Sequence, residues 1–309
     1  MNRHVRQDLE EGTCEEGVFK QMTAYGYSVL QDAFWVRRIL HPTDLSQGSE
    51  VAFAHALRLA VNVGACLQII HIDREDQNTH WKTYPKVRET LQRWSVLFDV
   101  ATEADLAKLN VGVEKVKAHA TDPVLPILEA LERDPVDLIV LATHQRKGLD
   151  RWLHKDIATR LARLASVKTL FVPHHADGFV NILDGTVLLH NVLIPVNDEP
   201  RPEAAIQAAS ALALALGGAS TKFHLLHVGD FIMDLSSLTL PNCDDWSWKT
   251  SFGDGNVVQE ILSSATRKRC DLIAMTTQGH HGFLDALRGS TTEKILREAN
   301  CPVLAVPAA

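Results

Sequence analysis

The residues best suited to chemistry form a segment of glycines and hydroxyls near the end of the chain. Nine residues separate Gly279 from Gly289, which is followed by the hydroxyl pair Ser290 and Thr291. Glycine lets a backbone approach a ligand closely. The free N–H groups and the dipole at the start of a helix favour an anion. The segment, which begins at Thr276, therefore predicts a phosphate-binding loop that opens a helix.

A plainer interpretation stays open, in which Ser290 only caps a helix and residues 276–288 only connect two elements. The sequence holds no Gly-x4-Gly-Lys-(Ser/Thr) loop and no Gly-x-Ser-x-Gly elbow, and Gly253-Asp254-Gly255 lacks a third glycine. No nucleophile has an obvious base and orienting partner. We therefore expect no catalytic residues and at most slow ATP hydrolysis.

The 15 histidines raise the question of a metal site. His224 and His227 lie three positions apart in a predicted strand, so their side chains point to opposite faces. His71 and His227 end equivalent strands of a sequence repeat, which favours a shared structural role. We therefore expect no metal site.

The sequence contains an internal duplication. Asp137–His144 returns 134 positions later as Asp271–Gln278, and Thr169–Pro173 returns at the same offset as Val303–Pro307. An earlier pair, Ile39–Asp44 and Val192–Asn197, repeats at an offset of 153. Repeat units of solenoids run to roughly 20–50 residues, so this long repeat indicates a duplicated domain. The second copy is the shorter one in its middle.

Each copy alternates predicted strands with predicted helices, which indicates parallel sheets covered by helices. The expected strands are 38–41, 67–72, 111–120, 137–142, 168–172, 187–196, 222–228, 246–252, 271–275 and 302–306. The expected helices are 49–63, 87–109, 122–132, 154–165, 201–217, 255–268 and 290–299. The predicted fold class is α/β, with two tandem open, mainly parallel five-stranded sheets and helices on both faces. Ligands of such sheets bind beyond the carboxyl ends of the strands, where Asn197 follows the first strand of the second copy.

The domain boundaries follow from the repeat. We expect an N-terminal arm at 1–34, a first domain at 35–173, a linker at 174–186 and a second domain at 187–309.

The net charge of -7 argues against a nucleic-acid partner. Five cysteines without a CxxC pair indicate reduced thiols. With no secretory signal and no apolar stretch long enough to cross a bilayer, we expect a cytoplasmic protein that does not bind membranes.

Both copies resemble universal stress protein domains, over 38–173 and 187–307. Nucleotide-binding members of that family carry Gly-x2-Gly-x9-Gly-(Ser/Thr) after the fourth strand and an Asp, facing adenine, after the first. The second copy matches at Gly279, Gly289 and Ser290 and departs at Thr276 and Asn197. The first copy keeps the acidic residue and loses the loop, whose positions are taken by Ala142, Gln145 and Lys155-Asp156, while the acid is Asp44.

The resemblance implies a fold like that of the adenine nucleotide alpha hydrolases and a stress-response protein that binds an adenine nucleotide, ATP above all, with or without Mg²⁺. The nucleotide is expected in the second domain as a regulatory ligand. The implied site residues are Asn197, Thr276, Gly279, Gly289, Ser290 and Thr291. The strands 168–172 and 302–306 are expected to pair across a pseudo-twofold axis, so that one chain contains the dimer that single-domain relatives form. A homodimer of whole chains is a further expectation.

Two alternatives stay open. One is an interaction or scaffold protein of the same fold that binds no nucleotide, and the other is a weak ATPase or a metal-binding protein. The retained Gly279 and Gly289-Ser290 argue against the scaffold, whereas Thr276 and Asn197 argue for it.

Overall fold

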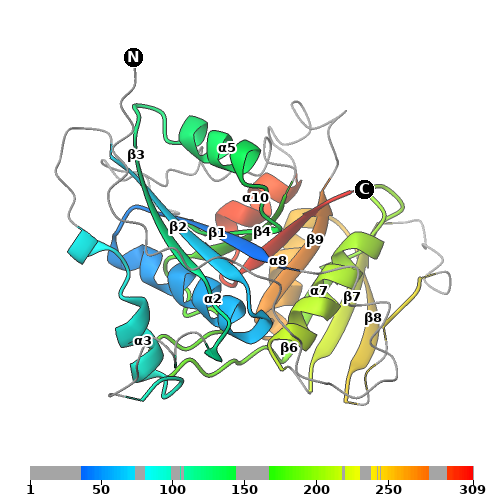
Figure 1. Cartoon of the computed structure of the whole chain (residues 1–309). Coiled ribbons are helices and arrows are strands. Elements are labelled where there is room, and N and C mark those ends of the chain that lie inside the picture. Colours follow the sequence, from blue (N-terminus) through cyan, green and yellow to red (C-terminus); the bar gives the residue numbers. More distant parts are fainter. Residues whose placement is uncertain are drawn as a thin grey trace.

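The computed structural model describes residues 36–73, 81–98, 105, 108–143, 167–217, 220–229, 238–241, 243, 245–277 and 291–308 (Figure 1). The first half of the chain forms β1 (Arg38–Thr43), α2 (Gln47–Val63), β2 (Cys66–Asp73), η1 (Trp81–Thr83), α3 (Val87–Arg93), β3 (Val113–His119), α5 (Val124–Arg133), β4 (Leu138–Thr143) and β5 (Lys168–Pro173). The second half forms β6 (Asn191–Pro195), α7 (Glu203–Ala215), β7 (Lys222–Val228), β8 (Ser247–Gly253), α8 (Val257–Arg267), β9 (Leu272–Thr277), α10 (Thr291–Glu298) and β10 (Val303–Pro307). The expected helix at 154–165 lies outside the described residues.

The ten strands form one continuous sheet in the order β3-β2-β1-β4-β5-β10-β9-β6-β7-β8. The five strands of each half are parallel to one another. The halves meet where β5 and β10 pair antiparallel. The expected α/β fold and the expected pairing of the last strands are therefore confirmed. The two five-stranded sheets that the sequence predicted are one ten-stranded sheet, because this pairing joins them edge to edge.

A pseudo-twofold axis passes through this junction. Leu170 of β5 is paired with Leu304 of β10, and these residues stand at equivalent positions of the repeat, 134 apart. Both side chains are fully buried. In an isologous contact a residue meets its own equivalent at the axis, so the seam inside this chain has the geometry of a symmetric dimer interface.

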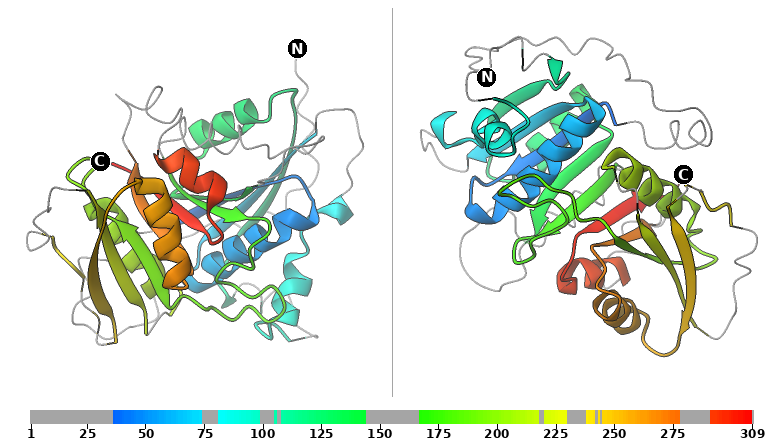
Figure 2. Two further views of the ribbon diagram at one scale, coloured as in Figure 1. Left: turned by 180° about the vertical axis from the view of Figure 1, so that it is seen from behind. Right: turned by 90° about the horizontal axis from the view of Figure 1, so that it is seen from below.

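The helices cover both faces of the sheet. Helices α2 and α7 contact each other on one face, and α8 and α10 pack together on the other, as the views in Figure 2 show. This arrangement follows from right-handed crossovers, which place a helix on opposite faces according to the direction in which the strand order advances. Each half is therefore doubly wound.

The inner strands form the core. All six residues of β4 and all six of β9 are buried, as expected of strands covered on both faces. The residue before each strand fixes its start: Asp137 Oδ2 accepts the N–H groups of Arg37 and Arg38, and Asp271 Oδ2 accepts those of His190 and Asn191. The same carboxylate thus ties the first strand to the fourth in both halves.

Helix ends follow the local sequence in most places. Gly64 ends α2 in the left-handed region (φ 67°), a conformation that glycine adopts without a Cβ clash. Asp122 accepts the N–H of Val124 at 3.1 Å at the start of α5. Both residue types favour the helix ends at which they stand.

The predicted helix at 87–109 is wrong in length, because α3 ends at Arg93. Trp94 leaves the helix to dock on the chain between β5 and β6, where its Nε1 donates to the Ile182 carbonyl at 3.2 Å. A Cβ at Gly185 would overlap the same indole ring. Ser95 then turns the chain through a positive φ of 55°. A tertiary contact therefore ends a helix that local propensity would continue.

The predicted strand at 187–196 also begins later, at Asn191. Val187 makes only an isolated bridge to Val180. Residues 174–190 connect β5 to β6, and we call them the strap. Phe179 and Val180 of the strap are fully buried, so this connection packs into the core instead of crossing the surface as a free linker.

Candidate functional site

The carboxyl ends of β6 and β9 form the edge at which the sequence places a ligand. The two strands are adjacent and parallel, with Leu193 opposite Ile273. Asn197, just after β6, and Thr276, in β9, therefore belong to the same edge. Thr291 begins α10. Gly279, Gly289 and Ser290 lie outside the described residues.

Asn197 presents an exposed side chain in the turn between β6 and α7. Its Nδ2 donates to the Glu199 carbonyl at 3.3 Å. The side-chain amide carries both donor and acceptor groups, which suit a nucleobase edge. The preceding residue, Val196, is buried and donates its N–H to the Leu226 carbonyl, so the base of the turn is fixed.

Thr276 has a contact that sequence reasoning missed. Its side chain is buried, and its Oγ1 accepts the N–H of Ala205 in the first turn of α7 at 3.2 Å. The N-cap residue of α7 is Pro202, which makes no side-chain capping bond. A signal for this contact existed, because a helix that opens without Ser, Thr, Asp or Asn needs an acceptor from elsewhere.

Helix α10 is described from Thr291 onward, within the range 290–299 that the sequence predicts for a helix, and Thr292, Ile295 and Leu296 are buried. This buried face fixes the helix on the sheet. The residues directly ahead of Thr291 lie outside the described part of the chain.

The corresponding edge of the first half is built differently. One oxygen of Asp44, Oδ1, accepts the N–H of Ser46 at 3.0 Å, the Ser46 hydroxyl at 2.6 Å and the Ser49 hydroxyl at 2.5 Å. The carboxylate therefore sits at the start of α2, where the helix dipole favours negative charge. Its conformation depends on Leu45, which adopts a positive φ of 58°.

A buried charged cluster at the end of β2 distinguishes the first half further. Asp73 lies 2.8 Å from Nε2 of His71 and 3.0 Å from Nζ of Lys117. Burial and the Asp73 charge raise the pKa of the neighbouring Tyr84. In the second half Gly229 follows β7, and His227 contacts the Phe252 ring instead of a lysine. His71 and Asp73 are two positions apart in the sequence, but Lys117 comes from the neighbouring strand β3, so sequence reasoning did not find the full cluster.

The two equivalent histidines share a structural role, as predicted. Nδ1 of His71 lies 2.9 Å from the Thr43 carbonyl, and Nδ1 of His227 lies 3.1 Å from the Val196 carbonyl. Thr43 and Val196 are themselves equivalent residues of the repeat. Each imidazole thus ties the end of the second strand of its half to the end of the first.

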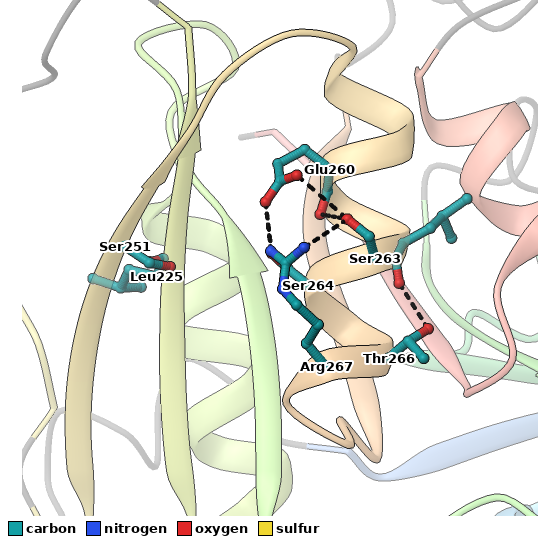
Figure 3. Close-up of polar contacts among 8 residues, drawn as sticks. Leu225, Ser251, Glu260, Ser263, Ser264, Thr266 and Arg267 are labelled. Carbon is teal, nitrogen blue, oxygen red and sulfur yellow. Dashed lines mark hydrogen bonds and ion pairs between the residues drawn. The ribbon is translucent and has the colours of Figure 1, made fainter.

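A metal centre and a surface polar cluster are two other kinds of polar grouping at which a site could lie. Within the part of the chain that the structure describes, no three His, Cys, Asp or Glu side chains gather as metal ligands do. On α8, Glu260 binds Arg267 at 2.6 Å, and Ser264 bonds to both, as Figure 3 shows. These side chains satisfy one another, and Arg267 is exposed.

The fold and this edge define an α/β protein of the doubly wound class. The model of the universal stress protein family matches residues 36–173 and 247–307. The chain therefore belongs to the universal stress protein family.

Known relatives agree with this assignment. A curated universal stress protein of Methanocaldococcus jannaschii is 38% identical over 65 residues, which span 20% of this chain and 38% of that protein. The solved structure of a universal stress protein from Archaeoglobus fulgidus has a TM-score of 0.58 at 18% identity and covers 89% of this chain and 100% of its own. A putative universal stress protein of Pseudomonas aeruginosa has a TM-score of 0.59 at 15% identity, covering 89% and 95%. These structures share the fold.

No helix among the described residues has both the length and the apolar character needed to cross a membrane.

Proposed function

We propose that the protein is a stress-response protein that binds an adenine nucleotide, with ATP as the first candidate, at the carboxyl edge of its second half. The nucleotide is a regulatory ligand, and no reaction is assigned to it. Family membership supports the stress-response role. The observation that supports nucleotide binding is the sequence spacing Gly279-x9-Gly289-Ser290-Thr291, which leads directly into the described part of α10.

Each residue at the carboxyl edge of the second half would contact or support a different part of the nucleotide. The first N–H groups of α10 and the hydroxyls of Ser290 and Thr291 would hold phosphate oxygens. Gly279 and Gly289 would let the backbone approach the phosphates. Asn197 would hydrogen-bond the base from its exposed position. Thr276 would fix the start of α7 beside the ligand, because its hydroxyl accepts the Ala205 N–H.

The first half is proposed to bind no triphosphate. Asp44 already accepts three hydrogen bonds at the start of α2 through one oxygen. The sequence places Lys155-Asp156 where the family carries Gly-Ser. A carboxylate at that place would repel phosphates.

The alternative is an interaction protein of the same fold with no nucleotide. It is favoured by Thr276, which replaces the first glycine of the family loop and is committed to capping α7. A role in binding a partner protein would then remain after the nucleotide site was lost.

Calorimetric titration of the full chain with ATP and Mg²⁺, and separately with AMP, tests the proposal. We expect one site per chain. Absence of binding at millimolar nucleotide would support the interaction protein, and two equivalent sites would show that the first half binds as well. A matched pair of variants that separates the halves is described in the Discussion.

A further inference from the structure

The strap is held on α2 by one fully buried side chain, that of His55. Its Nδ1 lies 2.7 Å from the Val51 carbonyl one turn earlier in the helix. Its Nε2 accepts the N–H groups of Phe179 at 3.0 Å and Val180 at 3.2 Å. One imidazole thus joins the first half to the connection between the halves.

The partners of His55 determine its protonation. A carbonyl oxygen can only accept, so Nδ1 must carry a proton and donate it to Val51. Two N–H groups can only donate, so Nε2 must carry none. The ring is therefore neutral and in the Nδ1–H form, a tautomer assigned by its hydrogen bonds.

Packing makes this contact specific. The Phe179 ring meets the imidazole edge-on, with ring centroids 4.4 Å apart. Gly178 has a φ of 70°, and a Cβ there would overlap the imidazole. Only a glycine lets the strap backbone pass so close to the ring.

We propose that His55 is a pH-sensitive clasp: in mild acid, a proton at Nε2 removes the acceptor of the Phe179 and Val180 N–H groups, and the strap leaves α2. The proton comes from solvent, and no covalent bond other than Nε2–H forms. The released strap loosens the joint between the two halves without requiring the core strands to unfold.

The direction of the effect follows from the two states. Burial lowers the pKa of His55 to about 4, and the hydrogen bond to Val51 opposes this shift only in part. With the strap open the ring would titrate near its ordinary value of about 6.5. The closed state is therefore fully favoured above about pH 6.5 and loses its advantage as the pH falls toward 4. Between pH 8 and pH 5 the ratio of open to closed strap should rise about 30-fold.

Neighbouring titratable groups do not supply this response. Those on the elements that pack against α2, on α2 itself and on the strap are Arg38, His41, Glu50, Arg58, His71, Asp73, Lys168, His174, His175, Asp177, Asp184, His190 and Glu203. Among the described residues, none of these charges contributes to the shift of the His55 pKa, which burial dominates. His41 is buried too, but it bonds to the Val140 carbonyl in the sheet and not to the strap.

Hydrogen exchange of the full-length protein, resolved to the amides of Phe179 and Val180, tests the clasp. After correction for intrinsic exchange, the protection of these two amides should fall about 30-fold from pH 8 to pH 5 and should stay below that of the β4 amides, which exchange only through global unfolding. His55→Gln should abolish the pH dependence. His227→Gln, which changes a buried histidine away from the strap, should preserve it. Gly178→Ala should leave the two amides poorly protected at both pH values.

Three outcomes would overturn the proposal. The protection of Phe179 and Val180 could be independent of pH in the wild type, it could equal that of β4 at both pH values, or its pH response could survive in His55→Gln. A measurement on the wild type covers the case in which the variants fail to fold. Nitrogen NMR of the histidine rings at pH 7 should find the His55 proton on Nδ1, and a proton on Nε2 would also overturn the clasp.

Discussion

The side-chain amide of Asn62 in α2 donates to the backbone carbonyl of Ala215 in α7 at 3.0 Å, and these two residues are equivalent positions of the repeat. Like the pair of Leu170 and Leu304, they meet at the pseudo-twofold axis. In a homodimer the same residue would stand on both sides of such an axis. Here an asparagine faces an alanine, so the fused chain has specialised its two halves at their contact.

The seam between the halves should be a main source of stability. Leu170→Ala and Leu304→Ala should each lower the free energy of unfolding by about 2–5 kcal/mol, because each removes a fully buried side chain. The double variant should lose an amount different from the sum, since the two residues are paired. Urea unfolding measures all three, with Leu188→Ala, at an exposed position, as the control. Strict additivity would contradict a shared contact.

The repeated carboxylates should contribute equally. Asp137→Ala and Asp271→Ala each remove a charged acceptor from two backbone N–H groups. Each should cost about 2–3 kcal/mol in the free energy of unfolding. Chemical denaturation of the two variants provides the comparison, and a large effect in one half alone would argue against equivalent roles.

Thr276 should act through its hydroxyl as a cap of α7. Thr276→Val keeps the shape and removes the acceptor of the Ala205 N–H, and it should destabilise the protein by about 1 kcal/mol. Thr276→Ser keeps the acceptor and should lose less. Thermal or urea unfolding distinguishes the two, and equal effects would mean that packing of the Thr276 methyl group matters instead.

Nucleotide binding should depend on the second half alone. Gly289→Asp should abolish binding in the full chain, because it adds a side chain and a negative charge where the phosphates are proposed to lie. Asp44→Ala, at the equivalent edge of the first half, should leave the affinity unchanged. Titration calorimetry with ATP and Mg²⁺ measures both. Loss of binding in the Asp44 variant, with binding intact in the Gly289 variant, would show that the site belongs to the first half.

Global stability should fall in acid through His41. Burial lowers the pKa of this fully buried imidazole to about 4, with hydrogen bonding to Val140 and the Asp44 charge opposing the shift. An unfolded chain binds the proton near pH 6.5, so the stability that depends on the neutral ring is present above that pH and lost between about 6.5 and 4. From pH 8 to pH 5 this should remove about 2 kcal/mol.

The variant His41→Ile tests this linkage. Isoleucine is the residue at the equivalent position of the second half, Ile194. Urea unfolding at pH 8 and pH 5 should show a pH-dependent loss that is smaller in the variant by about 2 kcal/mol. An unchanged loss would place the acid sensitivity at other groups.

Much of the fold could be predicted because each half repeats local patterns that decide structure by themselves. The apolar run of β4 returns in β9, and Gly64 is a helix stop by its conformation. The end of α3 could not be predicted, since Trp94 leaves the helix for a contact with Ile182, 88 residues away. Long-range contacts of this kind leave no mark in local periodicity.

The candidate site was predicted less completely than the fold. The edge followed from the strand order, and a helix in the range 290–299 followed from the sequence pattern. The role of Thr276 could not be predicted. In the sequence it only replaces a glycine of the family loop, and its hydrogen bond to the Ala205 N–H is visible only in the structure. The cluster of Asp73, His71 and Lys117 could not be predicted either, because it depends on the long-range pairing of β2 with β3.

The antiparallel joint between β5 and β10 has a consequence for signalling. Because the strands of the two halves run in opposite directions, their carboxyl edges face opposite ends of the molecule. A ligand on one edge and a group on the other cannot share an occupant or compete for one. Coupling between the two edges therefore requires a conformational change that passes through the β5–β10 pairing or through the α2–α7 contact.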